Sequence, residues 1–450
     1  MADTDAGTVA GPSQAVKWRF GLAVVSVAIV TALFAIAFRE TLSEVVGWLG
    51  GSDIVSMIAN APMWERVVLP AAGGLGAGLI GLAMARRKGG GGVGYVMEAI
   101  VLGRSRIPVV RSVLQALASW LAIATGNSLG REGPLITFGA AAGEGARRAF
   151  QLDDATARLV LAAGVAAGFA SAYNAPIAAT LFVVEVVTGV MVLEAAVTIL
   201  VASVIATVVT RFVIGAAPLY GLRNFSSPAA IELLAYAGLG LIAAPVGVGF
   251  LRLLSFAERG WRRLPMPFRP TIGGATCGAI LCLLPAVAGN GFEPLQALLD
   301  GRIALAGICW LLLAKPLATA ASVSSGNPGG VFTPTLLVGA CLGALFAIGL
   351  HEIFGGAISS TGSYALVGLA AALAATTHAP LTSAILACEL SGDYALVLPL
   401  LIACAIAAGL ARHLYIDSVY TAELTRRGIR WRLTLDGRRV AESQQDDYVI

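Results

Sequence analysis

Long stretches without a charged residue limit most strongly what this chain can fold into. Four of them are long enough to cross a membrane: Phe20–Phe38, Leu159–Val184, Leu233–Leu251 and Tyr394–Ala411. A helix needs about 20 apolar residues to cross the hydrocarbon core. Only 12% of the residues are charged, against roughly 25% in an ordinary soluble domain. The sequence therefore predicts an all-α polytopic membrane protein and argues against a soluble enzyme, a disordered chain or a strand-alternating β-barrel.

The basic residues gather between the apolar stretches and near the chain ends, and they do not form one surface that would suit a nucleic acid. Four clusters stand out: Lys17 with Arg19, Arg86 to Lys88, Arg252 to Arg269, and Arg426 to Arg439. By the positive-inside rule we expect all four clusters, and hence both termini, to lie in the cytoplasm. We expect the protein to lie in the inner membrane of the cell. We expect no cleavable signal peptide, because the first fourteen residues are polar and carry Asp3 and Asp5.

Motifs of enzymes and metal sites are missing from the sequence. We find no P-loop, no G-x-S-x-G and no clustered metal ligands, so we expect no enzymatic activity and no cofactor. The six cysteines lie in apolar segments without metal spacing, which favours packing thiols: Cys277, Cys282, Cys309, Cys341, Cys388 and Cys404. The formal dinucleotide pattern from Gly76 to Gly81 lies in an apolar run, where helix packing explains it better.

An internal repeat gives the architecture. The segment Gly130-Arg131-Glu132-Gly133-Pro134 recurs, 200 residues later, as Gly330-Val331-Phe332-Thr333-Pro334. Downstream, Ala175-Pro176 and Glu185 are matched by Ala379-Pro380 and Glu389. Both segments interrupt apolar sequence with glycine and proline, and such paired interruptions point to a central transport site between inverted repeats built from tilted, broken and half-spanning helices.

The two repeated motifs favour an anion. Each is a loop containing glycine, followed by an apolar helix with a proline in its first turn. Unpaired N–H groups and the positive end of the dipole lie at such a helix N-terminus. Two N-termini that converge from the two halves would hold a small anion without a fixed positive charge, which favours rapid release.

These residues resemble a known family, the CLC chloride channels and chloride/proton exchangers without nucleotide-sensing domains. Gly130 to Pro134 matches the family's GREGP signature, and Ser325 to Pro334 resembles its GxFxP segment. Arg104-Ser105-Arg106-Ile107-Pro108 falls where the family has GSGIP, and Tyr420 falls where it has a C-terminal tyrosine. The resemblance runs from about residue 20 to about residue 425.

The resemblance implies a role for each matched residue. The hydroxyls of Ser105 and Tyr420 and the backbone amides of Val331 and Phe332 would bind the central anion. Glu132 would be the gate, because its carboxylate competes with the anion and leaves when it is protonated. Alternatives stay open: Glu132 could serve only as a helix-start residue, and Tyr420 as an interfacial aromatic.

Two departures from the family pattern affect the function. Arg104 and Arg106 replace the glycines that flank the serine; they would either concentrate anions near the pore or play a structural part. Val186 stands where family exchangers carry a second, proton-transferring glutamate. Because valine cannot relay protons, we expect a passive chloride channel, with a chloride/proton antiporter as the alternative and a carrier of another solute as a weaker one. The preceding Glu185 has an expected structural role at a helix end.

The expected organisation is a cytoplasmic N-terminal segment (1–15), a first membrane repeat (16–215), a linker (216–229), a second membrane repeat (230–425) and a cytoplasmic tail (426–450). The family resemblance implies about eighteen helical segments and a homodimer in which each subunit has its own pore. The sequence after Tyr420 is too short for paired nucleotide-sensing modules, so we expect no regulation by ATP through them.

Overall fold

The computed structural model describes residues 14–85, 90–103, 106–266, 268–355, 358–434 and 437–442, and most of them are helical. Eighteen α-helices lie in these ranges: α1 (Gln14–Trp48), α2 (Ile54–Asn60), α3 (Met63–Ala85), α4 (Val93–Leu102), α5 (Val109–Ala124), α6 (Glu132–Phe150), α7 (Asp154–Tyr173), α8 (Pro176–Phe182), α9 (Leu193–Ile214), α10 (Leu233–Trp261), α11 (Phe268–Leu283), α12 (Phe292–Leu299), α13 (Leu305–Ser324), α14 (Phe332–Phe354), α15 (Thr361–Thr377), α16 (Pro380–Ser391), α17 (Val397–Leu414) and α18 (Thr421–Arg426). A π-helical turn (Val183–Thr188) and two 3-10 turns (Ala230–Glu232, Pro285–Val287) join some of them.

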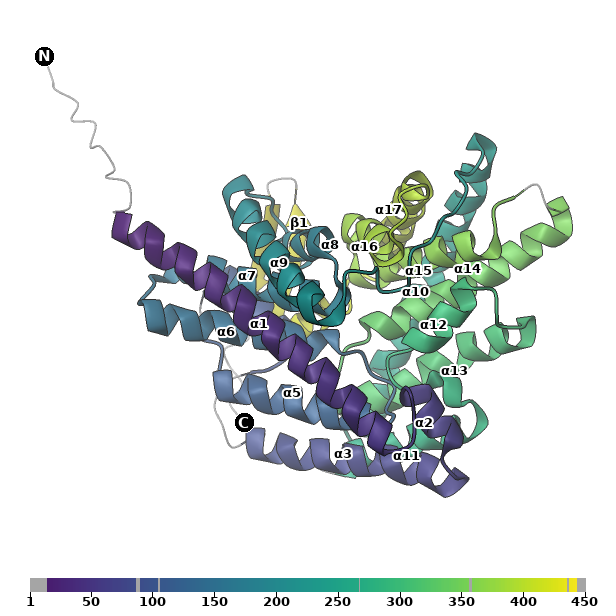
Figure 1. Ribbon diagram of the computed structural model, residues 1–450, viewed down its shortest axis with the longest axis horizontal. Helices are drawn as coiled ribbons and strands as arrows, with labels where there is room; N and C mark the ends of the chain where they lie inside the picture. The colour runs from purple at the N-terminus through teal and green to yellow at the C-terminus, as the bar shows by residue number, and fades with distance from the viewer. Residues whose placement is uncertain are drawn as a thin grey trace, which may run out of the picture.

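Eight of the described helices are long and apolar enough to cross a membrane: α1, α3, α7, α9, α10, α13, α14 and α17. Many of their large apolar side chains are exposed, as expected for surfaces that face lipid. Figure 1 shows the helices of the first half, in purple and blue, on one side of the molecule, and those of the second half, in green, on the other. The predicted all-α, multi-pass membrane fold is confirmed.

One stretch that is long enough to cross as a single helix, Leu159–Val184, is instead broken in two. Helix α7 ends at Tyr173, and Asn174 adopts a left-handed conformation with φ 57°. Helix α8 then begins at Pro176, where a proline fits because the first N–H groups of a helix have no partner. The Asn-Ala-Pro sequence therefore turns the chain between two helices within this apolar stretch.

The two repeats pack against each other with matching contacts. A Cβ added at Gly74 of α3 would lie 2.1 Å from the Pro270 oxygen of α11, and one added at Gly274 would lie 2.1 Å from the Pro70 oxygen. Only glycine permits so close an approach of two helix backbones. The pseudo-two-fold relation between the halves is thus visible as a pair of equal distances.

Two glutamates cap helices of the opposite repeat in the same reciprocal manner. The Glu389 carboxylate accepts hydrogen bonds from the amides of Ile177 (3.1 Å) and Ala178 (2.8 Å) at the start of α8. The Glu185 carboxylate accepts them from Leu381 (3.1 Å) and Thr382 (2.7 Å) at the start of α16. These bonds satisfy backbone donors that the helices leave unpaired. The expected helix-end role of Glu185 is what the geometry shows.

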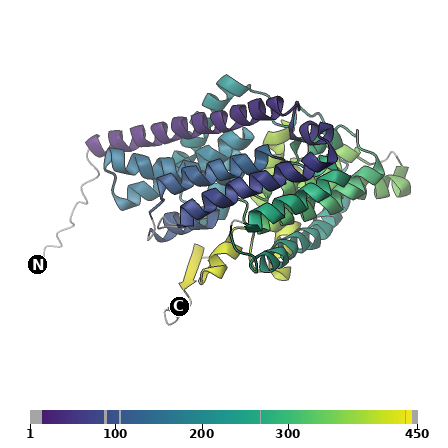
Figure 2. The same cartoon turned by 90° about the horizontal axis from the view of Figure 1, so that it is seen from below.

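The C-terminal segment and the cysteines show two further features. Within the predicted cytoplasmic tail, β1 (Ile429–Thr434) and β2 (Gly437–Glu442) form a two-stranded antiparallel hairpin, which projects from one edge of the helical body (Figure 2). All six cysteines, which lie in the described chain, are free thiols. Four are buried, but Cys282 is half-buried and Cys309 exposed, so the prediction of packing thiols fails for Cys309.

Candidate functional site

The two repeated motifs meet in the middle of the molecule. Gly130 and Gly330 form an antiparallel bridge, in which the Gly130 amide donates to the Gly330 oxygen (2.7 Å) and the Gly330 amide to the Gly130 oxygen (2.8 Å). Helix α6 begins two residues after the first glycine and α14 two residues after the second. The bridge therefore holds the N-termini of two helices from opposite repeats beside each other.

The Glu132 carboxylate lies at the N-terminus of α14. Its side chain is buried, and Oε1 accepts a hydrogen bond from the Phe332 amide at 2.9 Å. The Oε2 atom accepts hydrogen bonds from the Thr333 hydroxyl (3.2 Å) and the Tyr173 hydroxyl (3.4 Å). An unpaired backbone donor, two hydroxyls and the helix dipole together stabilise a negative charge at this point.

The glycines of both motifs make room for this carboxylate. A Cβ at Gly330 would lie 1.8 Å from Oε1 of Glu132, and one at Gly130 would lie 2.3 Å from both carboxylate oxygens. A side chain at either position would collide with the carboxylate where it now lies. At Gly133 the nearest atom would be 3.7 Å away, which is an ordinary contact. Only the glycines of the bridge are thus required by the Glu132 position.

Aromatic rings surround the Phe332 end of the site. Phe332 packs edge-on against Phe169, with ring centres 5.4 Å apart, and at 5.3 Å from the Tyr173 ring. Phe182 stacks on Phe169 at 4.6 Å and meets the Tyr420 ring edge-on at 5.6 Å. Tyr420, at the start of α18, is therefore joined to Phe332 through a continuous cluster of rings.

Other predicted site residues lie at the ends of helices around this centre. Val331 immediately precedes α14 and is buried, and Pro334 lies in the first turn of that helix. Pro134 is buried in the first turn of α6. Ile107 is buried, and Pro108 precedes α5.

Of the two arginines beside the predicted serine, one lies in the described part of the chain. Arg104 and Ser105 lie outside the described residues. The Arg106 guanidinium forms an ion pair of 3.0 Å with Asp154 at the start of α7, and both side chains are more than half exposed. Arg106 thus has the structural contact that the sequence left as one of two alternatives.

Val186 lies in the π-helical turn after α8, and its side chain is buried. The position that family exchangers use for proton transfer therefore holds a hydrocarbon group in this chain.

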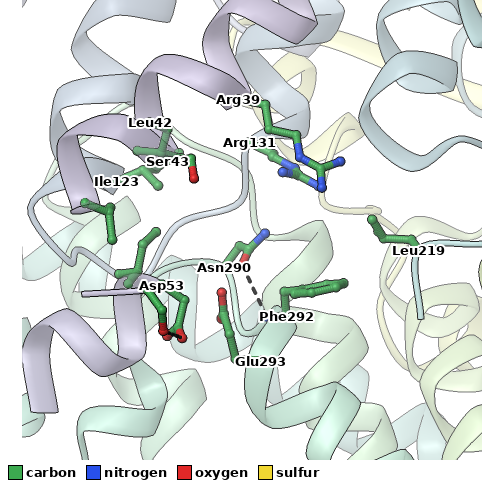
Figure 3. Close-up of a pocket in the computed structure, with 13 residues that line it drawn as sticks. Arg39, Leu42, Ser43, Asp53, Ile123, Arg131, Leu219, Asn290, Phe292 and Glu293 are labelled. Carbon is green, nitrogen blue, oxygen red and sulfur yellow. Dashed lines mark hydrogen bonds between the residues drawn. The ribbon is translucent and has the colours of Figure 1, made fainter. Parts of the chain in front are cut away.

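Two cavities are lined by residues next to the site in the sequence. One, with a volume of about 260 Å³, is lined by Val331 and Val419, the neighbours of Phe332 and Tyr420. The other, of about 190 Å³, is lined by Arg131, the neighbour of Glu132 (Figure 3). Glu132 lines neither cavity, but its sequence neighbour Arg131 lines one, and Val331, which precedes its hydrogen-bond partner Phe332, lines the other.

Two contributors to the site were not predicted from the sequence. Thr333 lies within the second motif, where its hydroxyl could have drawn attention. Tyr173 ends α7 far from either motif, and nothing in the sequence around it indicates that its hydroxyl lies 2.9 Å from that of Thr333.

The comparisons with known proteins agree with this geometry. The sequence profile of the voltage-gated chloride channel family, Voltage_CLC, matches residues 73–412. The chain belongs to this family. The predicted resemblance to the CLC proteins is therefore confirmed.

Relatives and solved structures give the same result along nearly the whole chain. The "Putative chloride channel protein ClcB-like" of Ralstonia nicotianae is 39% identical over 88% of this chain and 94% of its own length. The voltage-gated ClC-type chloride channel ClcB of Escherichia coli is 34% identical over 89% of this chain and 97% of its own. A solved structure of a slow cyanobacterial Cl⁻/H⁺ antiporter aligns with a TM-score of 0.82 at 24% identity, covering 91% of this chain and 98% of that one. At that identity the structural match shows the CLC fold alone.

Proposed function

We propose that this CLC protein conducts chloride passively across the membrane through a pore in each subunit, and that Glu132 gates the pore. The observation that carries the proposal is the buried Glu132 carboxylate, hydrogen-bonded to the Phe332 amide at 2.9 Å at the N-terminus of α14. A carboxylate at a helix N-terminus occupies the kind of site that suits a small anion. An anion can take this place only when the carboxylate leaves it.

The chloride site would consist of uncharged donors. The amides of Val331 and Phe332 lie at the start of α14, and the hydroxyls of Tyr420 and Ser105 complete the set by family resemblance. The described members of this set carry partial charges only, so they would bind chloride weakly enough for rapid release. Protonation of Glu132 removes the charge that competes with chloride, so flux should rise as the pH falls.

Val186 favours a channel over an exchanger. A coupled exchanger needs a titratable group that carries protons on a branch separate from the anion path, and valine has none. The relatives named chloride channels are 34% to 39% identical to this chain. A specific observation also supports the alternative, chloride/proton exchange: two structural neighbours of this fold are described as antiporters, one of chloride and one of fluoride.

We further propose a homodimer in the inner membrane with both termini in the cytoplasm. The basic clusters near both termini support this orientation by the positive-inside rule. The bacterial relatives named ClcB support the inner membrane as the location.

Flux measurements on the purified protein in liposomes test the proposal. Chloride efflux is followed with a chloride electrode, and luminal pH with a trapped dye. We expect chloride efflux that is abolished when the charge-compensating ionophore is left out, without proton movement coupled to it. Protons driven uphill by a chloride gradient would overturn the channel assignment and support the antiporter. Absence of chloride flux would overturn both.

A further inference from the structure

The cavity lined by Arg131 is also lined by a second arginine, Arg39. Arg39 lies in the membrane-crossing helix α1, and Figure 3 shows its guanidinium beside that of Arg131 at the edge of the cavity. Arg39 interacts electrostatically with the positive charge of Arg131 and with the negative charge of Glu40. Among the residues that the structure describes, neither guanidinium forms an ion pair with a carboxylate, and Glu40, which follows Arg39 on α1, is exposed.

The position of Arg39 along α1 is not explained by membrane topology. Lys17 and Arg19 lie near the N-terminal end of the same helix. Arg39 follows Lys17 by a rise of about 33 Å along the helix, which is about the thickness of the hydrocarbon core. Arg39 therefore lies at the opposite membrane face from Lys17, where the positive-inside rule does not favour arginine.

The cavity offers a third donor and enough room for an anion. The Asn290 Oδ1 atom accepts a hydrogen bond from the Phe292 amide at 3.2 Å, which turns its NH₂ group toward the arginines (Figure 3). The cavity volume of about 190 Å³ accommodates a small anion with several waters, since one liquid water takes about 30 Å³.

Two carboxylates also line the cavity. Asp53 is held by the cap of α2, where its Oδ1 accepts a hydrogen bond from the Ser56 amide at 2.8 Å. Glu293, at the start of α12, points into the cavity (Figure 3). Their negative charge limits the cavity to weak binding of a single small anion, which suits an ion that must move on.

We propose that Arg39, Arg131 and the Asn290 side-chain amide form an outer capture site for a small inorganic anion, which supplies the path behind Glu132. The inference rests on the proposed function, because chloride is the anion that such a path would carry. Two neighbouring guanidinium groups raise the local anion concentration. Arg131 directly precedes Glu132 in the sequence, so the capture site lies next to the proposed gate.

Bromide locates the site without any measurement of transport. Crystals of the wild-type protein grown in bromide should show an anomalous peak between Arg39, Arg131 and Asn290, and crystals of Arg39→Gln should lack it. A wild-type map without that peak, or a peak that persists unchanged in Arg39→Gln, would overturn the capture site. This result does not depend on whether the protein conducts chloride.

Flux kinetics test whether the site supplies the path. In liposomes at low ionic strength, Arg39→Gln should raise the half-saturating chloride concentration about tenfold. Arg39→Lys should stay within about twofold of the wild type, because it keeps the charge. Glu293→Gln should lower the half-saturating concentration.

An unchanged half-saturating concentration in a folded Arg39→Gln protein that still conducts would overturn the inference. A wild type without chloride flux would instead overturn the proposed function, and the bromide result would then decide the site.

A matched control removes a positive charge close by. Arg302 lies just after α12 and pairs at 2.5 Å with Asp300, and it does not line the cavity. The pKa of the Asp300 carboxyl lies below its usual value because Arg223 and Arg302 donate hydrogen bonds to it. Arg302→Gln should therefore leave the half-saturating chloride concentration unchanged. An increase as large as that of Arg39→Gln would mean a general surface charge effect and would overturn the capture site.

Discussion

The Glu132 carboxylate lies 2.9 Å from the backbone amide of Phe332, which follows it in the sequence by 200 residues. The contact joins the start of α6, which follows the first motif, to the start of α14, which follows the second. The bridge between Gly130 and Gly330 lies beside it. A negative side chain from one repeat thus occupies the anion-binding end of a helix in the other.

Removing the charge of Glu132 should open the path. In Glu132→Gln and Glu132→Ala the competing carboxylate is gone, so chloride flux should increase and no longer depend on pH. Chloride efflux from liposomes between pH 4.5 and pH 7.5 checks this. Glu194→Gln, the same change at an exposed glutamate in the first turn of α9, should behave as the wild type. Flux that keeps its pH dependence in Glu132→Gln would refute the gate assignment.

Gly330→Ala should have a similar effect without touching Glu132 itself. The new Cβ would lie 1.8 Å from Oε1, so the carboxylate has to move away from the Phe332 amide. We expect chloride flux that has lost most of its pH dependence. Gly349→Ala in α14, the helix that follows Gly330, is the control, because a Cβ there meets nothing within 4 Å. If a folded Gly330→Ala protein conducts with the wild-type pH profile, the carboxylate position seen here does not control the flux.

Much of this arrangement could be predicted from the sequence because it is repeated there. The offset between the Gly130 and Gly330 motifs identified two segments that meet, and the glycines and prolines identified helix starts. The matched glutamates Glu185 and Glu389 also came from the repeat. What the repeat could not show is which atoms each glutamate contacts in the other half, because that depends on how the helices pack.

Other features could not be predicted, for physical reasons. Tyr173 reaches Glu132 only because Asn174 and Pro176 break the apolar stretch at that point, and periodicity alone does not place such a break. In the sequence, Arg39 is an ordinary charged residue directly after an apolar stretch, and nothing there indicates its neighbours. Only the folded chain brings it beside Arg131, whose neighbour in the sequence is Glu132.

The reciprocal caps should contribute similarly to stability. Glu389→Ala leaves two amides at the start of α8 without partners, and Glu185→Ala leaves two at the start of α16. Each change should lower the free energy of unfolding by about 0.5–2 kcal/mol, the usual range for a lost helix cap. Thermal unfolding in detergent, followed by the loss of monodisperse protein, measures the order of the variants.

The matched control for the caps is Glu352→Ala, near the C-terminal end of α14, where the side chain is exposed. This variant should melt with the wild type. Glu185→Ala should be at least as destabilised as Glu389→Ala, because the Thr382 hydroxyl also donates to Glu185 at 2.6 Å. Wild-type melting of both cap variants would show that water replaces the carboxylates without cost.

Lys315 should hold the loop that carries Asn290. Its side chain on α13 is fully buried, and its Nζ donates hydrogen bonds to the oxygens of Val287 (3.0 Å) and Gly289 (2.8 Å). Lys315→Met keeps the length of the side chain but leaves two buried carbonyl groups without a donor, at about 1–3 kcal/mol each. We expect a lower melting temperature and faster hydrogen exchange of the backbone amides in residues 285–292. Leu313→Met, at an exposed position two residues earlier, should change neither quantity. If Lys315→Met exchanges at the wild-type rate in this loop, the two hydrogen bonds do not fix it, and the Asn290 side chain must be positioned by its bond to Phe292 alone.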